Sequence, residues 1–193
     1  AGADRILSVD LHSAAMEGFF DIPVDHLRSA SLLASHFERL YLPDVVVVSP
    51  DTGGVARAND LRERLGASLA IIYRQRRDHE SAQNLEMVGD VEGKTAIIID
   101  DMISTGGTLL MATEALLARG AKEVYACATH GVFAGDALET IDKSPLKRVV
   151  VTNTIPTAPE ASTEKLEVLS VGSLIAESIL RIHKDISLSS LFN

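Results

Sequence analysis

Short apolar runs alternate with longer amphipathic segments along this chain. The runs are rich in β-branched residues and end in turn residues, which is typical of strands buried on both faces of a parallel sheet. The expected strands are 5–9, 45–48, 69–72, 96–99, 124–129, 149–151 and 166–169. The amphipathic segments repeat apolar residues with the spacing of one helix face. The expected helices are 29–40, 58–65, 109–117, 134–141 and 171–182. This alternation predicts an α/β fold with a mostly parallel sheet flanked by helices on both faces.

Two segments break this pattern. Residues 13–26 contain Phe19, Phe20 and Pro23 without a clear period, and we interpret them as a loop with tucked aromatic side chains. Residues 73–93 are polar at first and also lack a period. About twenty residues of weak structure are unusual inside a compact domain, and such segments are often lids or binding loops.

The most informative segment is AIIIDDMISTGGT, residues 96–108. Its apolar run leads into Asp100 and Asp101, and ligands of open α/β sheets bind outside the carboxyl ends of strands. Gly106 and Gly107 lack the Cβ atoms that would keep a phosphate away from backbone N–H groups, and the next helix directs its positive dipole end there. The acids can accept hydrogen bonds from sugar hydroxyls or hold a hydrated divalent cation. Phosphate donors beside sugar acceptors suggest a ribose phosphate.

Polar groups also follow two other expected strands. His12 follows the first strand, and Asp51 with the pair Gly53–Gly54 follows the valine run. Parallel strands end at the same edge of a sheet, so we expect these groups and the two acids to share one crevice. His12 and Asp51 are candidate Mg²⁺ ligands, with structural hydrogen bonding as the alternative because imidazole is an uncommon magnesium ligand. A glycine pair alone is weak evidence, since plain turns contain them too.

Three arginines, Arg74, Arg76 and Arg77, open the long polar segment. Exposed arginines on a polar loop are usually just solvated. Alternatively, their guanidinium groups close over a polyphosphate and stabilise the charge that develops in phosphoryl transfer. Farther along, we interpret His130 as a structural histidine and Cys127 as a small buried core residue.

Length and charge narrow the classes of protein. The 193 residues suffice for one large domain, and nothing requires two. A net charge of −9 argues against a nucleic-acid surface, and no uncharged apolar run approaches the roughly 20 residues that span a bilayer. A single cysteine and the lack of a secretory or transit segment favour a cytoplasmic setting. The chain starts at Ala1 and enters a strand at once, so we expect further residues to precede it.

A set of ordered segments covers essentially the whole chain: VDLHSAAMEGFFDIPVDHL, VVSPDTGGVARA, the arginine-rich loop, VGDVEGKTAIIIDDMISTGGT, ARGAKEVYACATHGVF, SPLKRVVVTNTIP and ISLSSLFN. Together they resemble the ribose-phosphate pyrophosphokinases, also called phosphoribosyl pyrophosphate (PRPP) synthetases. Residues 96–108 alone would indicate only the wider phosphoribosyltransferase-type (type I) fold, which includes base-salvage enzymes and regulators. DLH, GFFDIPVDHL and SPDTGG narrow the resemblance to the synthetases.

This resemblance implies transfer of diphosphate from ATP to the C1 hydroxyl of ribose 5-phosphate, with Mg²⁺, giving PRPP and AMP for nucleotide biosynthesis. It assigns His12 and Asp51 to magnesium, and Asp100 and Asp101 to the ribose hydroxyls. The residues that it places around the 5-phosphate are Ser104, Thr105, Gly106, Gly107 and Thr108. It also implies catalytic roles for two loop arginines, Arg74 and Arg76, of which Arg76 contacts the reacting phosphates.

Two positions depart from the family pattern. Arg74 occupies the place of the catalytic lysine of many members, and a planar guanidinium does not replace a compact ammonium freely. A catalytically weak, synthetase-like regulatory subunit is therefore one alternative. Ser104 stands where many members have a third Asp and keeps a hydroxyl donor in the phosphate cradle. A PRPP-dependent phosphoribosyltransferase is the other alternative, although no base-recognition hood is apparent.

The resemblance also concerns the rest of the molecule. Members usually carry an N-terminal domain of similar fold that contributes adenine contacts, and this domain is absent from the sequence. We expect residues 1–193 to be the C-terminal domain, carrying the ribose 5-phosphate site, with a short linking segment at its start. A homo-oligomer, commonly a hexamer, is implied, with a phosphate or ADP effector site that residues 187–189 partly resemble.

Overall fold

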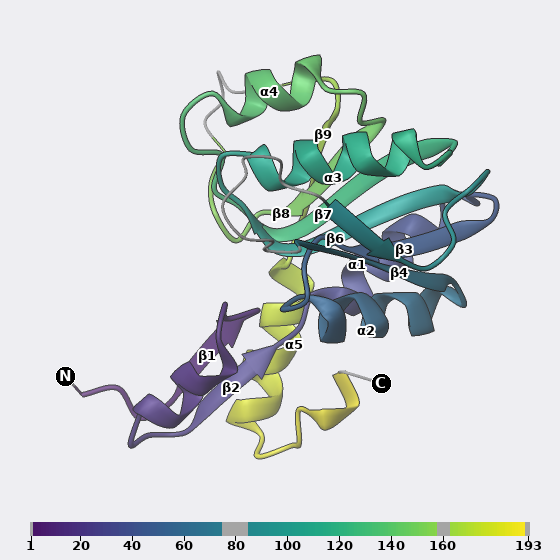
Figure 1. Ribbon diagram of the computed structural model, residues 1–193. Helices are drawn as coiled ribbons and strands as arrows, with labels where there is room; N and C mark the ends of the chain where they lie inside the picture. Colours follow the sequence, from purple (N-terminus) through teal and green to yellow (C-terminus); the bar gives the residue numbers. More distant parts are fainter. Residues whose placement is uncertain (1, 75–84, 158–162, 192–193) are drawn as a thin grey trace.

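A computed structural model describes residues 2–74, 85–157 and 163–191 (Figure 1). Within this part of the chain a seven-stranded sheet has the order β5-β4-β3-β6-β7-β8-β9. Its strands are β3 (Val45–Ser49), β4 (Ser68–Arg74), β5 (Leu85–Val88), β6 (Thr95–Ile103), β7 (Glu123–Gly131), β8 (Arg148–Thr152) and β9 (Leu166–Leu169). The strands pair in parallel except β5, which runs antiparallel to β4. The expected parallel sheet is confirmed.

Helices cover both faces of this sheet (Figure 1). They are α1 (Ala30–Glu38), α2 (Val55–Leu65), α3 (Gly107–Ala118), α4 (Ala137–Lys143) and α5 (Gly172–His183). Helices α3 and α4 lie on one face, and α1 and α2 lie on the other. The described helices are all too short or too polar to cross a bilayer.

The valine run in β3 shows why both faces must be covered. Successive side chains of a strand point to opposite faces. Val46 and Val48 pack in the core beneath α3, whereas Val47 packs in the core with residues of α1 and α2. Each of these valines is fully buried. A strand that is apolar on both sides is therefore stable only at the centre of a three-layer fold.

The N-terminal segment differs from expectation. Strand β1 (Ile6–Val9) pairs in parallel with β2 (Val24–Leu27) in a separate two-stranded sheet and not with the central sheet. The loop expected at 13–26 instead contains the short 3₁₀ helix η1 (Ala14–Phe19) and part of β2. Phe19 is 84% exposed and Phe20 41% exposed, so the prediction of tucked aromatics is wrong. The two rings pack against each other, edge to face, outside the core.

Residues 73–93 are also more ordered than expected at both ends. Strand β4 extends to Arg74, whose backbone pairs with Leu85 of β5. Strand β5 thus forms an antiparallel edge of the sheet, which the sequence pattern did not predict. A strand at a sheet edge is stabilised mainly by its neighbour, so its own residues give only a weak signal. Residues 75–84 lie outside the described part of the chain.

The order of the strands creates a topological switch point between β3 and β6. From β3 the chain continues to β4 on one side, whereas from β6 it continues to β7 on the other side. Strands β3 and β6 are neighbours, so the loops that leave their carboxyl ends turn in opposite directions. Such a switch point opens a crevice between the loops, and ligands of open α/β sheets bind there.

The glycines at the β5–β6 turn give a test of the packing. Gly89 has φ of 107°, and a Cβ there would lie 2.6 Å from the Leu69 carbonyl oxygen. Gly93 has φ of 70°, but a Cβ there would meet nothing within 4 Å. We expect Gly89→Ala to lower the free energy of unfolding by about 3 kcal/mol and Gly93→Ala by about 1 kcal/mol. Denaturant titrations measure both, and equal losses would contradict this account.

Candidate active site

The loop after β6 forms a cradle at the crevice. Residues 104–108 turn from β6 into α3, and Gly106 adopts φ of 79° at the start of that helix. No side chain caps the first turn of α3, so its backbone N–H groups are available to an anion together with the helix dipole. The glycine pair predicts a phosphate cradle here, and this arrangement of free N–H groups is suited to bind an anion.

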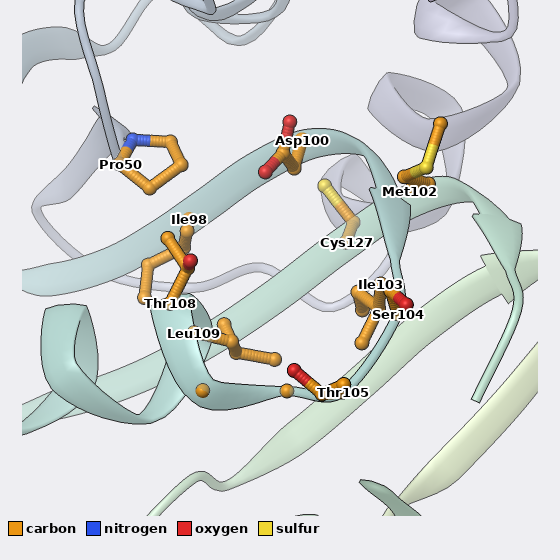
Figure 2. Close-up of a pocket in the computed structure, with 12 residues that line it drawn as sticks. Pro50, Ile98, Asp100, Met102, Ile103, Ser104, Thr105, Thr108, Leu109 and Cys127 are labelled. Atoms are coloured by element: carbon orange, nitrogen blue, oxygen red, sulfur yellow. The ribbon is translucent and has the colours of Figure 1, made fainter. Parts of the chain in front are cut away.

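A cavity of about 140 Å³ lies inside this loop (Figure 2). The loop residues Ser104–Thr108 line it on one side, and Asp100 and Pro50 lie across from them. Its lining also includes the apolar side chains of Ile98 and Cys127. Cys127 is buried as predicted, and burial raises the pKa of its thiol far above the ordinary value. The cysteine therefore contributes shape to the cavity and not a nucleophile.

The two acids lie within β6 and not after it. The strand continues past them to Ile103 because β7 pairs alongside, with Asp100 opposite Ala128 and Met102 opposite His130. Adjacent residues of a strand point to opposite faces. Asp100 accordingly lines the cavity, while Asp101 is 3% exposed and faces other partners.

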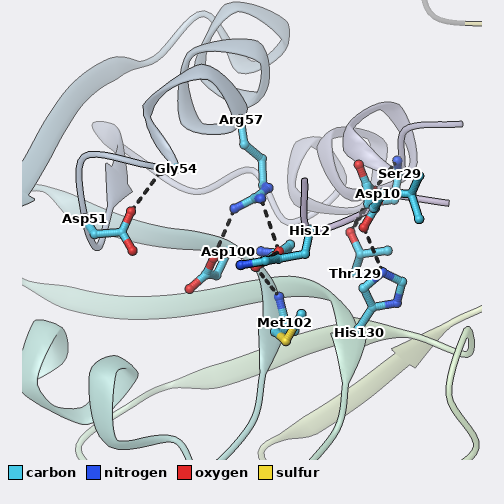
Figure 3. A network of polar contacts seen from close by, with 12 residues as sticks. Asp10, His12, Ser29, Asp51, Gly54, Arg57, Asp100, Met102, Thr129 and His130 are labelled. Carbon is cyan, nitrogen blue, oxygen red and sulfur yellow. Dashed lines mark hydrogen bonds and ion pairs between the residues drawn. The ribbon is translucent and has the colours of Figure 1, made fainter. Parts of the chain in front are cut away.

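A shared set of contacts holds both acids (Figure 3). Asp100 Oδ1 accepts hydrogen bonds from Arg57 Nη1 at 3.0 Å and from its neighbour's backbone N–H at 2.8 Å. Asp101 Oδ2 lies 2.5 Å from His12 Nδ1 and 3.6 Å from Arg57 Nη2. One guanidinium and one imidazole thus meet two adjacent carboxyl groups.

These surroundings shift the pKa values of the two acids in opposite directions. Burial, with a hydrogen bond to Asp101, raises the pKa of Asp100 to about 6 even though Arg57 opposes the shift. Burial alone would raise the pKa of Asp101, but His12, Asp100 and Arg57 together hold it below its usual value. The hydrogen bond and charge of Asp101 raise the pKa of His12 in return. At neutral pH Asp101 therefore carries the more firmly fixed negative charge.

Arg57 is a site residue that the sequence reasoning missed. It lies in the first turn of α2, three residues after Gly54. A cation is disfavoured at the positive end of a helix dipole unless something compensates it. An arginine at this place, directly after a loop with an acid and two glycines, is the signal that could have found it.

The loop after β3 places Asp51 on the other side of Arg57. Asp51 Oδ1 accepts a hydrogen bond from the Gly54 N–H at 2.9 Å, and its carbonyl accepts one from Ser49 Oγ at 2.7 Å. A Cβ on Gly54 would lie 2.9 Å from that hydroxyl oxygen, so a larger residue there would displace the Ser49 side chain from its hydrogen bond. The Asp51 carboxylate is exposed at the crevice, with Arg57 and Asp100 between it and His12 in Figure 3.

The structure brings together most of the predicted residues. His12, Asp100 and Asp101 meet, although His12 comes from the separate β1–β2 sheet and not from a neighbouring strand. Residues 104–108 lie beside them. The side chain of Arg74 and all of Arg76 lie outside the described residues. His130 has hydrogen-bond partners on both ring nitrogens, in agreement with a structural role.

Magnesium can be tested against this donor set. The described residues contain no group of three or more His, Cys, Asp or Glu side chains placed to hold a metal ion. Nδ1 of His12 contacts the Asp101 carboxylate, so Nε2 is the ring nitrogen whose lone pair can coordinate a metal ion. Mg²⁺ usually keeps several waters and binds through one or two protein groups plus substrate phosphates. The residues present fit an ion held in that way.

Comparison with known proteins shows the family to which this chain belongs. A family model described as the phosphoribosyl synthetase-associated domain matches residues 81–193. The chain belongs to the phosphoribosyl synthetase family. The ribose-phosphate pyrophosphokinase of Bacillus subtilis (strain 168) is 50% identical over 193 residues, which are 100% of this chain and 61% of that protein. Its counterpart from Caldanaerobacter subterraneus is 51% identical with the same coverage. The chain thus spans about three-fifths of the length of the curated relatives that it matches.

Solved structures agree with this assignment. The phosphoribosylpyrophosphate synthetase from Mycobacterium smegmatis is similar with a TM-score of 0.88 and 42% identity, over 95% of this chain and 60% of that chain. An APRTase from Giardia lamblia, complexed with 9-deazaadenine, has a TM-score of 0.51 and 17% identity over 63% of this chain and 75% of that one. The second likeness concerns the fold alone. The predicted phosphoribosyltransferase-type fold is confirmed.

The raised pKa of Asp100 predicts a pH-dependent stability. Its folded pKa of about 6 lies above the ordinary value of 3.8, so folding favours the protonated acid. That stabilisation is complete below the unfolded pKa and is lost as the pH rises through about 6. We expect Asp100→Asn to raise the free energy of unfolding above that of the wild type by about 1–2 kcal/mol at pH 8, and by less at pH 5. Denaturant titrations at both pH values measure the difference.

Asp90→Asn is the matched control with the opposite sign. The hydrogen bond from Lys94 holds the pKa of Asp90 below its usual value. Its contribution is present above the unfolded pKa and is lost as the pH falls. The asparagine variant should therefore be less stable than the wild type at pH 8, with the gap closing in acid. The same pH trend in both variants would contradict the assignment.

Proposed function

We propose that the protein containing this chain is a ribose-phosphate diphosphokinase. It transfers diphosphate from ATP to the C1 hydroxyl of ribose 5-phosphate and releases PRPP and AMP. The observation that carries this proposal is the cavity in which the amide cradle at 104–108 faces Asp100. An anion site next to carboxylates matches a sugar phosphate, because the two kinds of group need opposite partners. Membership of the synthetase family supports the same reaction.

Each part of the cavity takes one part of the sugar phosphate. The 5-phosphate binds at the backbone N–H groups of 104–108, with hydroxyl donors from Ser104, Thr105 and Thr108. The carboxylate of Asp100, which lines the cavity, accepts hydrogen bonds from the ribose hydroxyls, and the buried Asp101 is held by His12 and Arg57 behind it. Arg57 keeps both acids in place and offsets part of their charge, so that the crevice can bind an anionic substrate.

Magnesium and ATP complete the proposal. His12 Nε2 and the Asp51 carboxylate are the groups that would hold Mg²⁺, together with water and phosphate oxygens. The ion would neutralise charge on the phosphates of ATP, as in other phosphoryl transfers. Arg74 and Arg76 are proposed to be catalytic, with Arg76 in contact with the reacting phosphates. We place the adenine contacts in an N-terminal domain, with residues 1–193 as the C-terminal domain and a linking segment at its start.

We further propose a cytoplasmic homo-oligomer, a hexamer by resemblance, with a phosphate or ADP effector site. Large apolar side chains at the surface of the described residues support assembly. Phe19 on η1 is 84% exposed, and Ile179 and Ile186, on and after α5, are 56% and 50% exposed. Figure 1 shows the β1–β2 sheet and α5 on the same side of the central sheet.

A coupled assay tests the reaction. The full-length protein is incubated with ATP, Mg²⁺ and ribose 5-phosphate, and AMP is measured with PRPP. We expect the two products in equal amounts and dependent on ribose 5-phosphate. No AMP formation would overturn the proposal and favour a weakly active regulatory subunit. Release of diphosphate from PRPP only when a nucleobase is added would favour a phosphoribosyltransferase.

The role of Asp100 in sugar binding gives a second test. Asp100→Asn removes the charge that strengthens hydrogen bonds from the ribose hydroxyls, and such bonds contribute about 1.5–3 kcal/mol. We expect the KM for ribose 5-phosphate to rise about tenfold to hundredfold, with the KM for ATP nearly unchanged. Steady-state kinetics with each substrate varied in turn measure both values. Asp90→Asn, at the exposed turn before β6, is the control and should leave both KM values as they are.

A further inference from the structure

A second polar network lies directly beside the two acids, where β7 ends (Figure 3). Thr129 and His130 of β7 reach Asp10, the residue that follows β1. Asp10 has φ of 43°, a conformation that non-glycine residues adopt rarely although Asp tolerates it best. A residue in this region persists when its surroundings hold it firmly.

Contacts on both backbone groups and on one carboxylate oxygen hold Asp10. Its backbone N–H donates to the Leu27 carbonyl of β2 at 2.9 Å, and its own carbonyl lies 3.0 Å from His130 Nε2. Its carboxylate oxygen Oδ2 accepts hydrogen bonds from the Ser29 N–H at 2.9 Å and from Thr129 Oγ1 at 2.7 Å. The turn is thereby tied to β2, to the start of α1 and to the central sheet.

The chemistry of these groups fixes the direction of three of these hydrogen bonds. Thr129 Oγ1 has one proton, which it donates to the Asp10 carboxylate, so Ser29 Oγ donates to Thr129 Oγ1 at 2.7 Å. A carbonyl only accepts, so His130 Nε2 carries a proton. Thr154 Oγ1 lies 2.8 Å from the other ring nitrogen, Nδ1, and orients the ring. Ser29 and Thr129 are each 1% exposed, so the loss of one hydroxyl would leave a buried partner unsatisfied.

A second contact holds the next residue of the turn. The Leu11 N–H donates to His26 Nε2 at 2.8 Å, and His26 Nδ1 lies 2.6 Å from Glu17 Oε1. His12 follows immediately, with its ring 2.5 Å from Asp101 and its side chain 74% exposed. Strand β1 pairs with β2 and not with the central sheet. The position of the His12 backbone over β6 therefore depends on the contacts of the two residues before it.

We propose that Thr129 and His130 are positioning residues for His12. They anchor Asp10 to the carboxyl end of β7. Thr129 lies there level with Asp101 on β6, between the pairs Asp100–Ala128 and Met102–His130. This anchoring sets the place of the His12 ring at the crevice. The kinetic part of this inference rests on the proposed diphosphokinase function. A positioning role can have a measurable effect on the rate, because a displacement of about 1 Å in a reacting complex can lower the rate on the order of 100-fold.

The test compares isosteric variants in the full-length protein. Thr129→Val removes the hydroxyl and keeps the shape, whereas Thr129→Ser keeps the hydroxyl. We expect Thr129→Val to lower kcat/KM for Mg·ATP about tenfold to hundredfold, with the KM for ribose 5-phosphate unchanged within about twofold. Thr129→Ser should stay within about threefold of the wild type.

Thr113→Val is the matched control for a lost buried hydroxyl. Thr113 is 0% exposed and donates a hydrogen bond to the Leu109 carbonyl at 2.7 Å within α3. A purely structural effect would change both valine variants alike. We expect Thr113→Val to leave kcat/KM for Mg·ATP unchanged even where it lowers the melting temperature.

A second readout does not depend on activity. The imidazole Cε1–H signal of His12, assigned in NMR spectra with a His12→Gln variant, reports the surroundings of the ring. We expect it to shift or broaden in Thr129→Val and to stay in place in Thr113→Val and Thr129→Ser. An unchanged signal together with unchanged kinetics in Thr129→Val would overturn the proposal.

A pair of variants at His130 covers the case in which Thr129→Val does not fold. His130→Gln keeps an N–H donor for the Asp10 carbonyl, whereas His130→Leu removes it. We expect the His12 signal and kcat/KM to change in the leucine variant and to recover in the glutamine variant, and equal behaviour would overturn the proposal. If the wild type forms no AMP, the diphosphokinase function fails, and the His12 signal alone then decides the positioning role.

Discussion

Two adjacent carboxyl groups in the C-terminal half of β6, Asp100 and Asp101, impose the main constraint on this molecule. They lie close together in a partly buried crevice, where two full negative charges would repel each other and lose hydration. Arg57 from α2 and His12 from the N-terminal segment both reach them, so two separate parts of the chain converge on one short stretch of a central strand. The result is an uneven pair, in which Asp100 holds a proton more readily than Asp101.

The sheet order explains why other groups gather around this pair. Neighbouring strands β3 and β6 send their connections in opposite directions, which leaves their carboxyl ends accessible between the loops. One loop supplies an exposed acid, Asp51, and the other supplies an amide cradle at 104–108. Acceptors for hydroxyl groups and donors for a phosphate thus lie within one crevice without any long insertion. A sugar phosphate needs both kinds of partner in such proximity.

The N-terminal segment is connected to this crevice by polar contacts and not by the sheet. Strand β1 belongs to the small β1–β2 sheet, and its following turn is held by the ends of β7 and α1 and by a histidine of β2. Hydrogen bonds depend steeply on distance and angle, so a turn held in this way has a well-defined position. The apolar surface of η1 and α5, by comparison, remains exposed in this chain.

The sequence by itself determined the three-layer fold and the glycine-containing turn at the start of α3, because both follow from local patterns. Four consecutive valines require cover on two faces, and a glycine pair between a strand and a helix can be read from the residues alone. Only the tertiary structure decided which residues meet. The pairing of β7 extends β6 beyond Asp100, and the partner of β1 lies outside the central sheet. Arg57 gains its role from two acids, of which Asp100 is 43 residues away in the chain. Charge pairing and strand pairing join residues that are far apart in the chain, whereas residue patterns indicate only the structure of residues that are close in sequence.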